Sequence, residues 1–233
     1  RLQRNTMKIV VCGDSFMSAD ANRPGTHFSE LLINYAHTVT NLARGGISNT
    51  GIAFQIETAS KLQPDLILFS STGHDRIDIV IDNKKFHVDK GLKNFIYPYQ
   101  SDSSTGNQYV GGLDATILSD VIPAFLDPRP DLPTQLQDPS RANLVKQYLA
   151  LFHSYELQKV LDAWILGFWK YKLKEQQIPF IHLEQGGKVG QHMYSYVNKN
   201  PSKINQCVYH TDEQTQILMA DEIITEIARL KIL

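Results

Sequence analysis

Two residues far apart in the chain, Ser15 and His210, are of types that together can carry out nucleophilic catalysis. Ser15 lies in the segment CGDSF, where an apolar run stops abruptly at Gly13, and His210 directly precedes a segment with helical spacing of apolar residues. A serine hydroxyl becomes a good nucleophile only when a base accepts its proton, and histidine is the usual base because its pKa lies near neutrality. The alternative interpretation of Ser15 is a turn residue, since Gly, Asp and Ser are all common in turns.

The order of predicted elements favours an α/β fold in which helices cover both faces of a parallel sheet. Continuous apolar or β-branched runs predict strands at 7–13, 37–43, 65–71 and 178–184. Apolar residues at helical spacing predict helices at 25–37, 49–62, 143–176 and 210–230. In such sheets ligands bind beyond the carboxyl ends of the strands. We therefore expect Ser15, after the first strand, and His210, before the last helix, to meet at that edge.

The middle of the chain has a different composition. Six of the ten prolines lie between 78 and 142, and glycine, serine and aspartate crowd the stretch QSDSSTGNQYVGGLD. We interpret 78–142 as a long, irregular insertion within one domain that spans 1–233. Loops of this length are usually lids or binding loops. The alternative is a docking surface, through which the chain forms a homo-oligomer or joins a larger particle.

The predicted helix at 143–176 carries one broad apolar stripe. Its members recur at helical spacing: Leu157, Leu161, Trp164, Ile165 and Phe168. We expect the aromatic side chains of Trp164, Phe168 and Trp169 to lie in the core rather than to form a stacking platform for bases or sugars.

Four short segments fall at the ends of these predicted elements. In chain order they are CGDSF, NLARGGISNTG at 41–51, FSSTGHDR at 69–76 and YHTDEQTQILMADEI at 209–223. Together they resemble the conserved blocks of the SGNH, or GDSL-type, hydrolases, and the resemblance covers 7–84 and 178–230. It implies a flavodoxin-like, three-layer α/β/α sandwich and a serine esterase that works through an acyl-serine intermediate.

The resemblance also implies roles for individual residues. Ser15 matches the nucleophile, His210 the base, and the backbone N–H groups of Ser15 and Gly46 the donors of an oxyanion hole. His74 stands where the family has an asparagine whose side chain donates to the oxyanion. A histidine can fill that role, and Asn49 is the alternative donor. A second interpretation makes His74 a structural loop residue paired with Asp75.

A further departure from the family pattern concerns the third catalytic residue. The family often has an aspartate three residues before the histidine, and Cys207 occupies that position here. Such an acid holds the histidine in the right tautomer, and its loss costs roughly 10⁴ in turnover in the serine proteases. The chain then works as a dyad, or Glu184 or Asp212 supplies the acid, or the enzyme is slow or inactive.

Composition and motifs exclude several other functions. The formal net charge of −1 provides no basic field for nucleic acid. No uncharged apolar run of 18 residues predicts a membrane span, and no signal peptide is recognisable, so a cytoplasmic protein is expected. The histidines and the two cysteines lack metal-ligand spacing, and GGISNTG lacks the context of a phosphate loop. We therefore expect no metal and no organic cofactor.

Two functions remain from the sequence. The first is hydrolysis of a small acyl ester, with an acetyl group on a carbohydrate as the preferred substrate. The second is a binding or structural protein that kept the SGNH fold and lost efficient catalysis. The segments quoted above are also similar to GDSL-like proteins carried by tailed bacteriophages, for which a virion-associated location is the expectation.

Overall fold

The computed structural model describes residues 6–19, 24–35, 37–83, 99–101, 107–110, 115–121, 139–183 and 213–230. Its centre is a four-stranded sheet in the order β2-β1-β3-β8, with all neighbours parallel. The strands are β1 (Lys8–Cys12), β2 (Thr38–Asn41), β3 (Leu66–Ser70) and β8 (Phe180–Leu183). All four strands expected from the sequence are present, and the predicted parallel α/β fold is confirmed.

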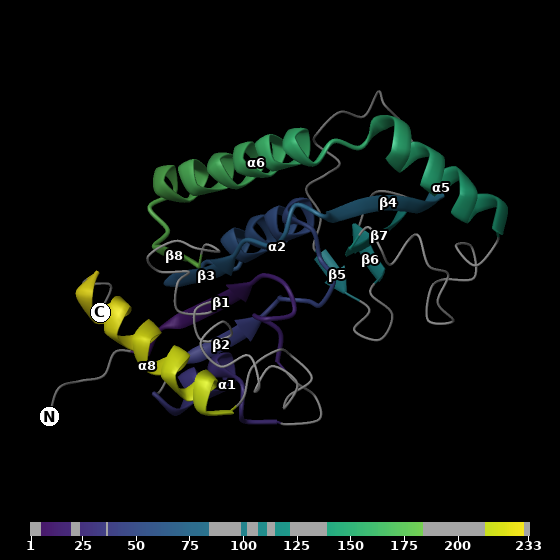
Figure 1. Ribbon diagram of the computed structural model, residues 1–233. Coiled ribbons are helices and arrows are strands. Elements are labelled where there is room, and N and C mark those ends of the chain that lie inside the picture. The colour runs from purple at the N-terminus through teal and green to yellow at the C-terminus, as the bar shows by residue number, and fades with distance from the viewer. Residues whose placement is uncertain are drawn as a thin grey trace, which may run out of the picture.

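Helices cover both faces of this sheet, as Figure 1 shows. The helices α1 (Phe28–Asn34) and α8 (Glu213–Arg229) cover one face, and α2 (Asn49–Lys61) and α6 (Tyr155–Glu175) cover the other. Side chains of β1 alternate between the two cores, with Ile9 and Val11 facing α1 and α8, and Val10 and Cys12 facing α2 and α6. Because both faces are covered, the strand is a continuous apolar run rather than an alternating one.

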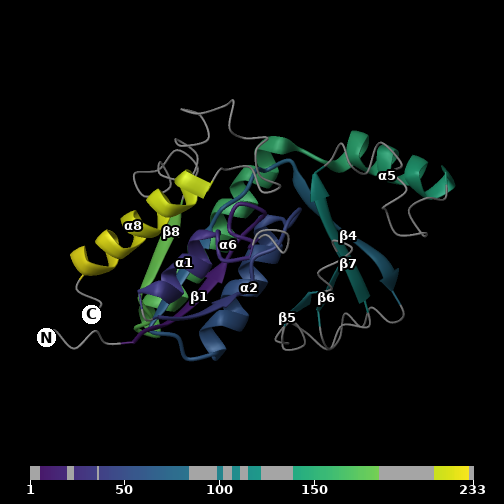
Figure 2. The same cartoon turned by 90° about the horizontal axis from the view of Figure 1, so that it is seen from below.

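The segment predicted to be irregular contains a second sheet. It is antiparallel, in the order β4-β7-β6-β5, and lies beside the parallel sheet (Figure 2). Its strands are β4 (Arg76–Asn83), β5 (Tyr99–Ser101), β6 (Asn107–Val110) and β7 (Ala115–Val121). The expectation of little regular structure between 78 and 142 is therefore wrong for the described part of that segment. The strands β5 and β6 have three and four residues, and the stretches 102–106 and 111–114 beside them are rich in glycine and serine, which hid this part of the sheet in the sequence.

The long helical segment is divided into two helices, α5 (Pro139–Phe152) and α6. His153 and Ser154 separate them, and the Ser154 hydroxyl caps α6 by accepting a hydrogen bond from the Leu157 N–H at 3.3 Å. Within the described residues, no helix is long and apolar enough to cross a membrane.

The orientation of α6 about its axis differs from the expectation. Trp164 is 70 % exposed and Phe168 is 52 % exposed, so both lie outside the core. Trp169 is only partly buried, against the core beneath α6, and Leu166 and Leu173 are the apolar side chains that are fully packed there. The helix is apolar on more than one side, and residue spacing alone did not identify the side that faces the sheet.

Candidate active site

Ser15 lies on a tight turn at the carboxyl end of β1. The Met17 N–H donates to the Asp14 carbonyl oxygen at 3.0 Å, which closes the turn around Ser15. The Asp14 carboxylate accepts a hydrogen bond from the Phe16 N–H at 3.1 Å, so Asp14 orients the loop. Ser15 is 8 % exposed, and the turn presents it within a nearly closed environment.

Gly13 joins β1 to this turn in a conformation that other residues rarely adopt. Its φ is +149°, and a Cβ added there would lie 2.4 Å from Met17 Cγ and 2.4 Å from Ser70 Oγ. The fully buried Gln55 of α2 holds the same residue from the other side: the Gly13 N–H donates to Gln55 Oε1 at 2.6 Å, and Gln55 Nε2 donates to the Gly13 carbonyl at 3.3 Å. A side chain at position 13 would push the serine turn out of place.

The glycine loop after β2 lies directly against Ser15. A Cβ built on Gly45 would stand 3.7 Å from Ser15 Cβ, and Gly46 has a φ of +78°. The Arg44 N–H donates to the Gly13 carbonyl at 2.9 Å, which ties the loop to the serine turn. Asn41 adds a second tie, because its amide donates to the Met17 carbonyl at 2.8 Å. The structure therefore brings the predicted nucleophile and the predicted oxyanion loop together.

A buried polar network runs from the serine turn toward α6. The Thr72 hydroxyl donates to Asp14 Oδ2 at 2.8 Å, and Arg76 Nη2 lies 3.7 Å from the same oxygen. Thr72 and Asn49 exchange two hydrogen bonds: the Thr72 N–H donates to Asn49 Oδ1 at 2.9 Å, and Asn49 Nδ2 donates to the Thr72 carbonyl at 3.0 Å. Asn49 Nδ2 also donates to Asp162 Oδ2 at 2.8 Å. Both hydrogens of the Asn49 amide are thus engaged within the protein.

The partner of His74 is a buried carboxylate that the sequence reasoning missed. His74 Nδ1 lies 2.7 Å from Asp162 Oδ2, and the ring of Tyr155 packs edge-on against the imidazole at 5.7 Å. Gln158 Nε2 donates to the other Asp162 oxygen at 2.7 Å. The expected pairing of His74 with Asp75 is therefore wrong, since the carboxylate that His74 bonds comes from α6. The one available signal was a single acidic residue inside the apolar stretch LDAWILGFW.

This pairing determines what His74 can do. A carboxylate only accepts hydrogen bonds, so Nδ1 carries the proton and Nε2 of the neutral ring is an acceptor. In that form His74 can take a proton, and it can donate from Nε2 only as an imidazolium. The side chain of His74 is 29 % exposed and that of Asp162 is 3 % exposed, so the acid is deep and the imidazole reaches the surface.

His210, Cys207, Glu184 and Asp212 lie outside the described residues. The helix that follows His210 is nevertheless linked to the serine turn by two hydrogen bonds. Gln216, in the first turn of α8, accepts a hydrogen bond from the Phe28 N–H at 2.9 Å.

The second bond joins the start of α1 to the serine turn. His27, the N-cap of α1, has its Nδ1 3.2 Å from the Ser29 N–H nitrogen and its Nε2 3.2 Å from the Phe16 carbonyl oxygen. Since a carbonyl can only accept, Nε2 is the donor and Nδ1 the acceptor. The first turns of α8 and α1 and the serine turn therefore lie at one end of the sheet.

Other parts of the described chain hold no comparable cluster. No group of three metal-ligating side chains is present among the described residues. Burial raises the pKa of the Cys12 thiol, which makes it an inert core residue, and burial lowers the pKa of His37.

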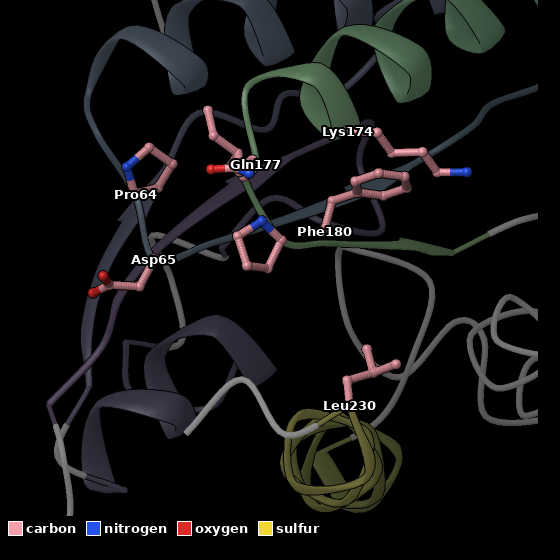
Figure 3. Close-up of a pocket in the computed structure, with 8 residues that line it drawn as sticks. Pro64, Asp65, Lys174, Gln177, Phe180 and Leu230 are labelled. Carbon is pink, nitrogen blue, oxygen red and sulfur yellow. The ribbon is translucent and has the colours of Figure 1, made fainter.

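An open groove of about 770 Å³ lies at the amino ends of β3 and β8, the opposite end of the sheet from Ser15. Figure 3 shows its wall, with Leu230 projecting from the α8 side toward Phe180.

No family model matches the chain, and no curated protein sequence matches it. One solved structure that is similar over most of its length is described as a "putative lipolytic protein of G-D-S-L family from Desulfitobacterium hafniense DCB-2". The two chains are 11 % identical, the likeness covers 93 % of this chain and 97 % of that chain, and the TM-score is 0.36. With a TM-score this low, function has to be inferred from the chain's own residues.

Proposed function

We propose that the protein is a serine hydrolase that cleaves carboxylic esters, with Ser15 as the nucleophile. The observation that carries this proposal is the close approach of Gly45, in the glycine loop after β2, to the Ser15 side chain: a Cβ built on Gly45 would stand 3.7 Å from Ser15 Cβ. An oxyanion hole requires backbone N–H groups fixed beside the nucleophile before the substrate binds. Ser15 stands on a braced turn at the carboxyl ends of parallel strands, where ligands bind in such sheets.

In this proposal the backbone N–H groups of Ser15 and Gly46 stabilise the oxyanion. Asn49 braces the site instead of donating to the substrate, because its two amide hydrogens already bond to Thr72 and Asp162. His74 adds a third donor, from Nε2, only as an imidazolium, with its Nδ1 bonded to the Asp162 carboxylate at 2.7 Å. The Asp162–His74 pair thus takes the place of the asparagine that the resemblance leads one to expect.

His210 is the proposed base. Glu213 follows it three positions later, a length that spans at most about 11 Å of extended chain. The first turn of α8 is joined through Gln216 and Phe28 to α1, and through His27 to the carbonyl of Phe16, the neighbour of Ser15. These bonds anchor the start of α8 at the same end of the sheet as the serine turn, which supports a short reach from His210 to Ser15.

The proposed reaction has two stages. Ser15 Oγ forms a bond to the ester carbonyl carbon while its proton passes to His210, and the same proton then goes to the leaving alcohol as the ester C–O bond breaks. Water next attacks the acyl-serine carbonyl and gives a proton to His210. The carboxylic acid leaves as Ser15 regains its proton.

The proposed substrate is a small acyl ester, with an acetyl group on a carbohydrate preferred. The low exposure of Ser15 supports a small acyl group, because a nucleophile this enclosed offers little room for a long chain. A polar alcohol fits the flanking side chains, since Arg76 Nη2 lies 3.7 Å from the Asp14 carboxylate of the turn.

A second candidate is a binding protein with this fold and little catalytic activity. The observation in its favour is that neutral His74 has no proton on Nε2 and that Asn49 is engaged, so the oxyanion hole has no uncharged side-chain donor from these two residues. The two candidate functions use the same site around Ser15 and differ in the rate of ester hydrolysis that they predict.

Hydrolysis of a short-chain aryl acetate by the full chain tests the proposal. Ser15→Ala and His210→Ala are expected to abolish turnover, and Ser18→Ala, three residues from the nucleophile, is the matched control that keeps it. Turnover that survives Ser15→Ala would overturn the proposal. Absence of turnover in the unmodified chain would favour the binding protein.

A further inference from the structure

The side of α6 that faces away from the sheet is apolar and exposed. Leu166 and Leu173 pack inward against the core shared with α2. On the opposite side, five large side chains are between 43 % and 70 % exposed: Leu157, Leu161, Trp164, Phe168 and Tyr171. We call these five residues the outer face of α6. Figure 1 shows α6 as the outermost element above α2, so within the described chain no other helix covers it.

The spacing of the outer face fits a single helical partner. The five residues follow one another at intervals of 4, 3, 4 and 3. That interval pattern is the a and d repeat of a coiled coil, and it produces a narrow stripe against which one further helix packs. A helix that served only to cover a sheet would place such a stripe inward.

Gly167 forms a notch beside the outer face. It lies in the middle of α6, three residues after Trp164 and four before Tyr171, so it shares their side of the helix. A Cβ built on Gly167 meets no atom within 4 Å. Glycine is among the least favourable residues in a helix interior, and nothing in the described subunit requires it here. An absent side chain at this place lets a large side chain from outside approach the backbone closely.

The charges along α6 favour a second copy of the same helix in antiparallel orientation. Glu156 lies in the first turn, and the last turn holds Lys172, Lys174 and Glu175, with Lys172 Nζ 3.1 Å from the Glu175 carboxylate. A parallel pair would align the two helix dipoles and bring Lys174 of both copies to the same end. An antiparallel pair opposes the dipoles and brings Lys174 of each copy toward the Glu156 end of the other.

The exposed apolar area is large enough for a stable dimer. A large aromatic side chain presents about 150–250 Å² in full, so at these exposures the five residues of the outer face contribute on the order of 500 Å². Two such faces together bury roughly 1,000 Å², which is about the lower limit for a specific interface. The face also falls within the range of about 300–600 Å² of the largest patch on a typical monomer, a patch that is often functional.

We propose that the outer face of α6 is the contact surface of a two-fold homodimer. Two copies of α6 pair antiparallel, and Trp164 of each copy fills the notch above Gly167 of the other. The contact is self-complementary, as a two-fold interface requires, because each copy supplies both the ring and the notch. This surface lies outside the 78–142 insertion, from which the sequence suggested assembly, and the dimer does not depend on the proposed hydrolysis.

Sedimentation of the full chain over a range of concentrations tests the dimer. The unmodified chain is expected to sediment as two chains. Trp164→Glu removes the ring, and Gly167→Leu fills the notch while raising helix propensity, so each should weaken association by about tenfold or more. Ile33→Glu alters an apolar residue on α1 that is 53 % exposed, and it is the matched control that should leave the dimer intact.

Gly167→Leu also separates loss of the contact from loss of the fold. The variant should keep its circular dichroism spectrum, because the added side chain meets no atom of its own subunit. A folded Gly167→Leu variant that sediments as one chain supports the proposal. An unmodified chain that is monomeric at every concentration overturns it, as does a dimer that persists undiminished in both variants; the outer face then has another occupant.

Discussion

The effect of replacing Asp162 by leucine on the stability of the protein has opposite signs in two views of this position. Leucine stabilises the protein if only the helix propensity and burial of the side chain on α6 matter, and destabilises it if the hydrogen bonds of the buried network matter more. Leucine is the better helix former by up to about 0.7 kcal/mol, and burying its side chain is worth about 1.5–3 kcal/mol. From the apolar stretch LDAWILGFW alone, the substitution should therefore stabilise the protein.

The structure predicts the opposite sign. The Asp162 carboxylate accepts hydrogen bonds from Asn49, His74 and Gln158 at 2.8, 2.7 and 2.7 Å. Bonds to a charged group are worth about 1.5–3 kcal/mol each, so losing three outweighs the gain from leucine. Because Asn49 is fully buried, its amide cannot turn to water. We expect Asp162→Leu to lower the free energy of unfolding by about 2–5 kcal/mol, in the range seen when one partner of a buried network is removed.

Asp162→Asn is the matched variant. Its amide oxygen still accepts from Asn49 and His74, and its NH₂ group can donate to Gln158 once that side-chain amide rotates by 180°. This variant loses charge but no partner, so the expected cost is about 1 kcal/mol.

Urea unfolding followed by tryptophan fluorescence measures both variants, since Trp164 and Trp169 lie on the same helix as position 162. Protein concentration is held fixed because the stability of a dimer depends on it. Asp162→Leu as stable as the unmodified chain, or more stable, would refute the network.

Two further predictions concern Gly13 and His37. Gly13→Ala should destabilise the protein by more than Gly25→Ala. Both replace a glycine of positive φ, a strain of about 1–3 kcal/mol, but only Gly13→Ala puts a Cβ 2.4 Å from neighbouring atoms. Equal shifts of the melting temperature in the two variants would show that the contact at position 13 is harmless. For His37, burial lowers the pKa in the folded state, so the unfolded chain binds the extra proton and stability falls as the pH drops below about 6.5, the unperturbed value. His37→Gln should flatten that decline in urea unfolding at pH 5 to 7, and an unchanged slope would assign the titration elsewhere.

The parallel sheet was predictable from the sequence because its strands are buried on both faces. Strands such as β1 and β3 are unbroken apolar runs, and the short connections between them left little choice of topology. The antiparallel sheet was predictable only in part. The strand β4 has isoleucine at every second position, at 77, 79 and 81, which is the alternation that identifies a strand. The strand β5 has only three residues, too few for that alternation.

The orientation of α6 shows a second limit. Spacing identified an apolar stripe, yet the helix has two, and Leu166 and Leu173 rather than Trp164 and Phe168 face the sheet. The choice between them depends on contacts with α2, which the local sequence does not contain. The outer stripe then becomes intelligible as a surface for another helix.

The candidate site was predictable where it depends on local chain geometry. Gly13, Asp14 and Ser15 form the expected turn, and the glycine loop meets it because both follow adjacent strands. The Asp162–His74 pair was not predictable, since its members are 88 residues apart and belong to different layers of the fold. His210 lies outside the described residues, so its role as base stays a prediction.

Covalent labelling of Ser15 tests the proposed chemistry at its first step. A fluorophosphonate reacts with a serine only when that hydroxyl is activated by a base and the oxyanion that forms is stabilised. Intact-mass analysis followed by peptide mapping of the full chain should find a single adduct on Ser15. The adduct should be absent from Ser15→Ala, strongly reduced in His210→Ala and retained in Ser18→Ala. An adduct on another serine, or labelling that survives Ser15→Ala unchanged, would contradict the assignment of Ser15 as the nucleophile.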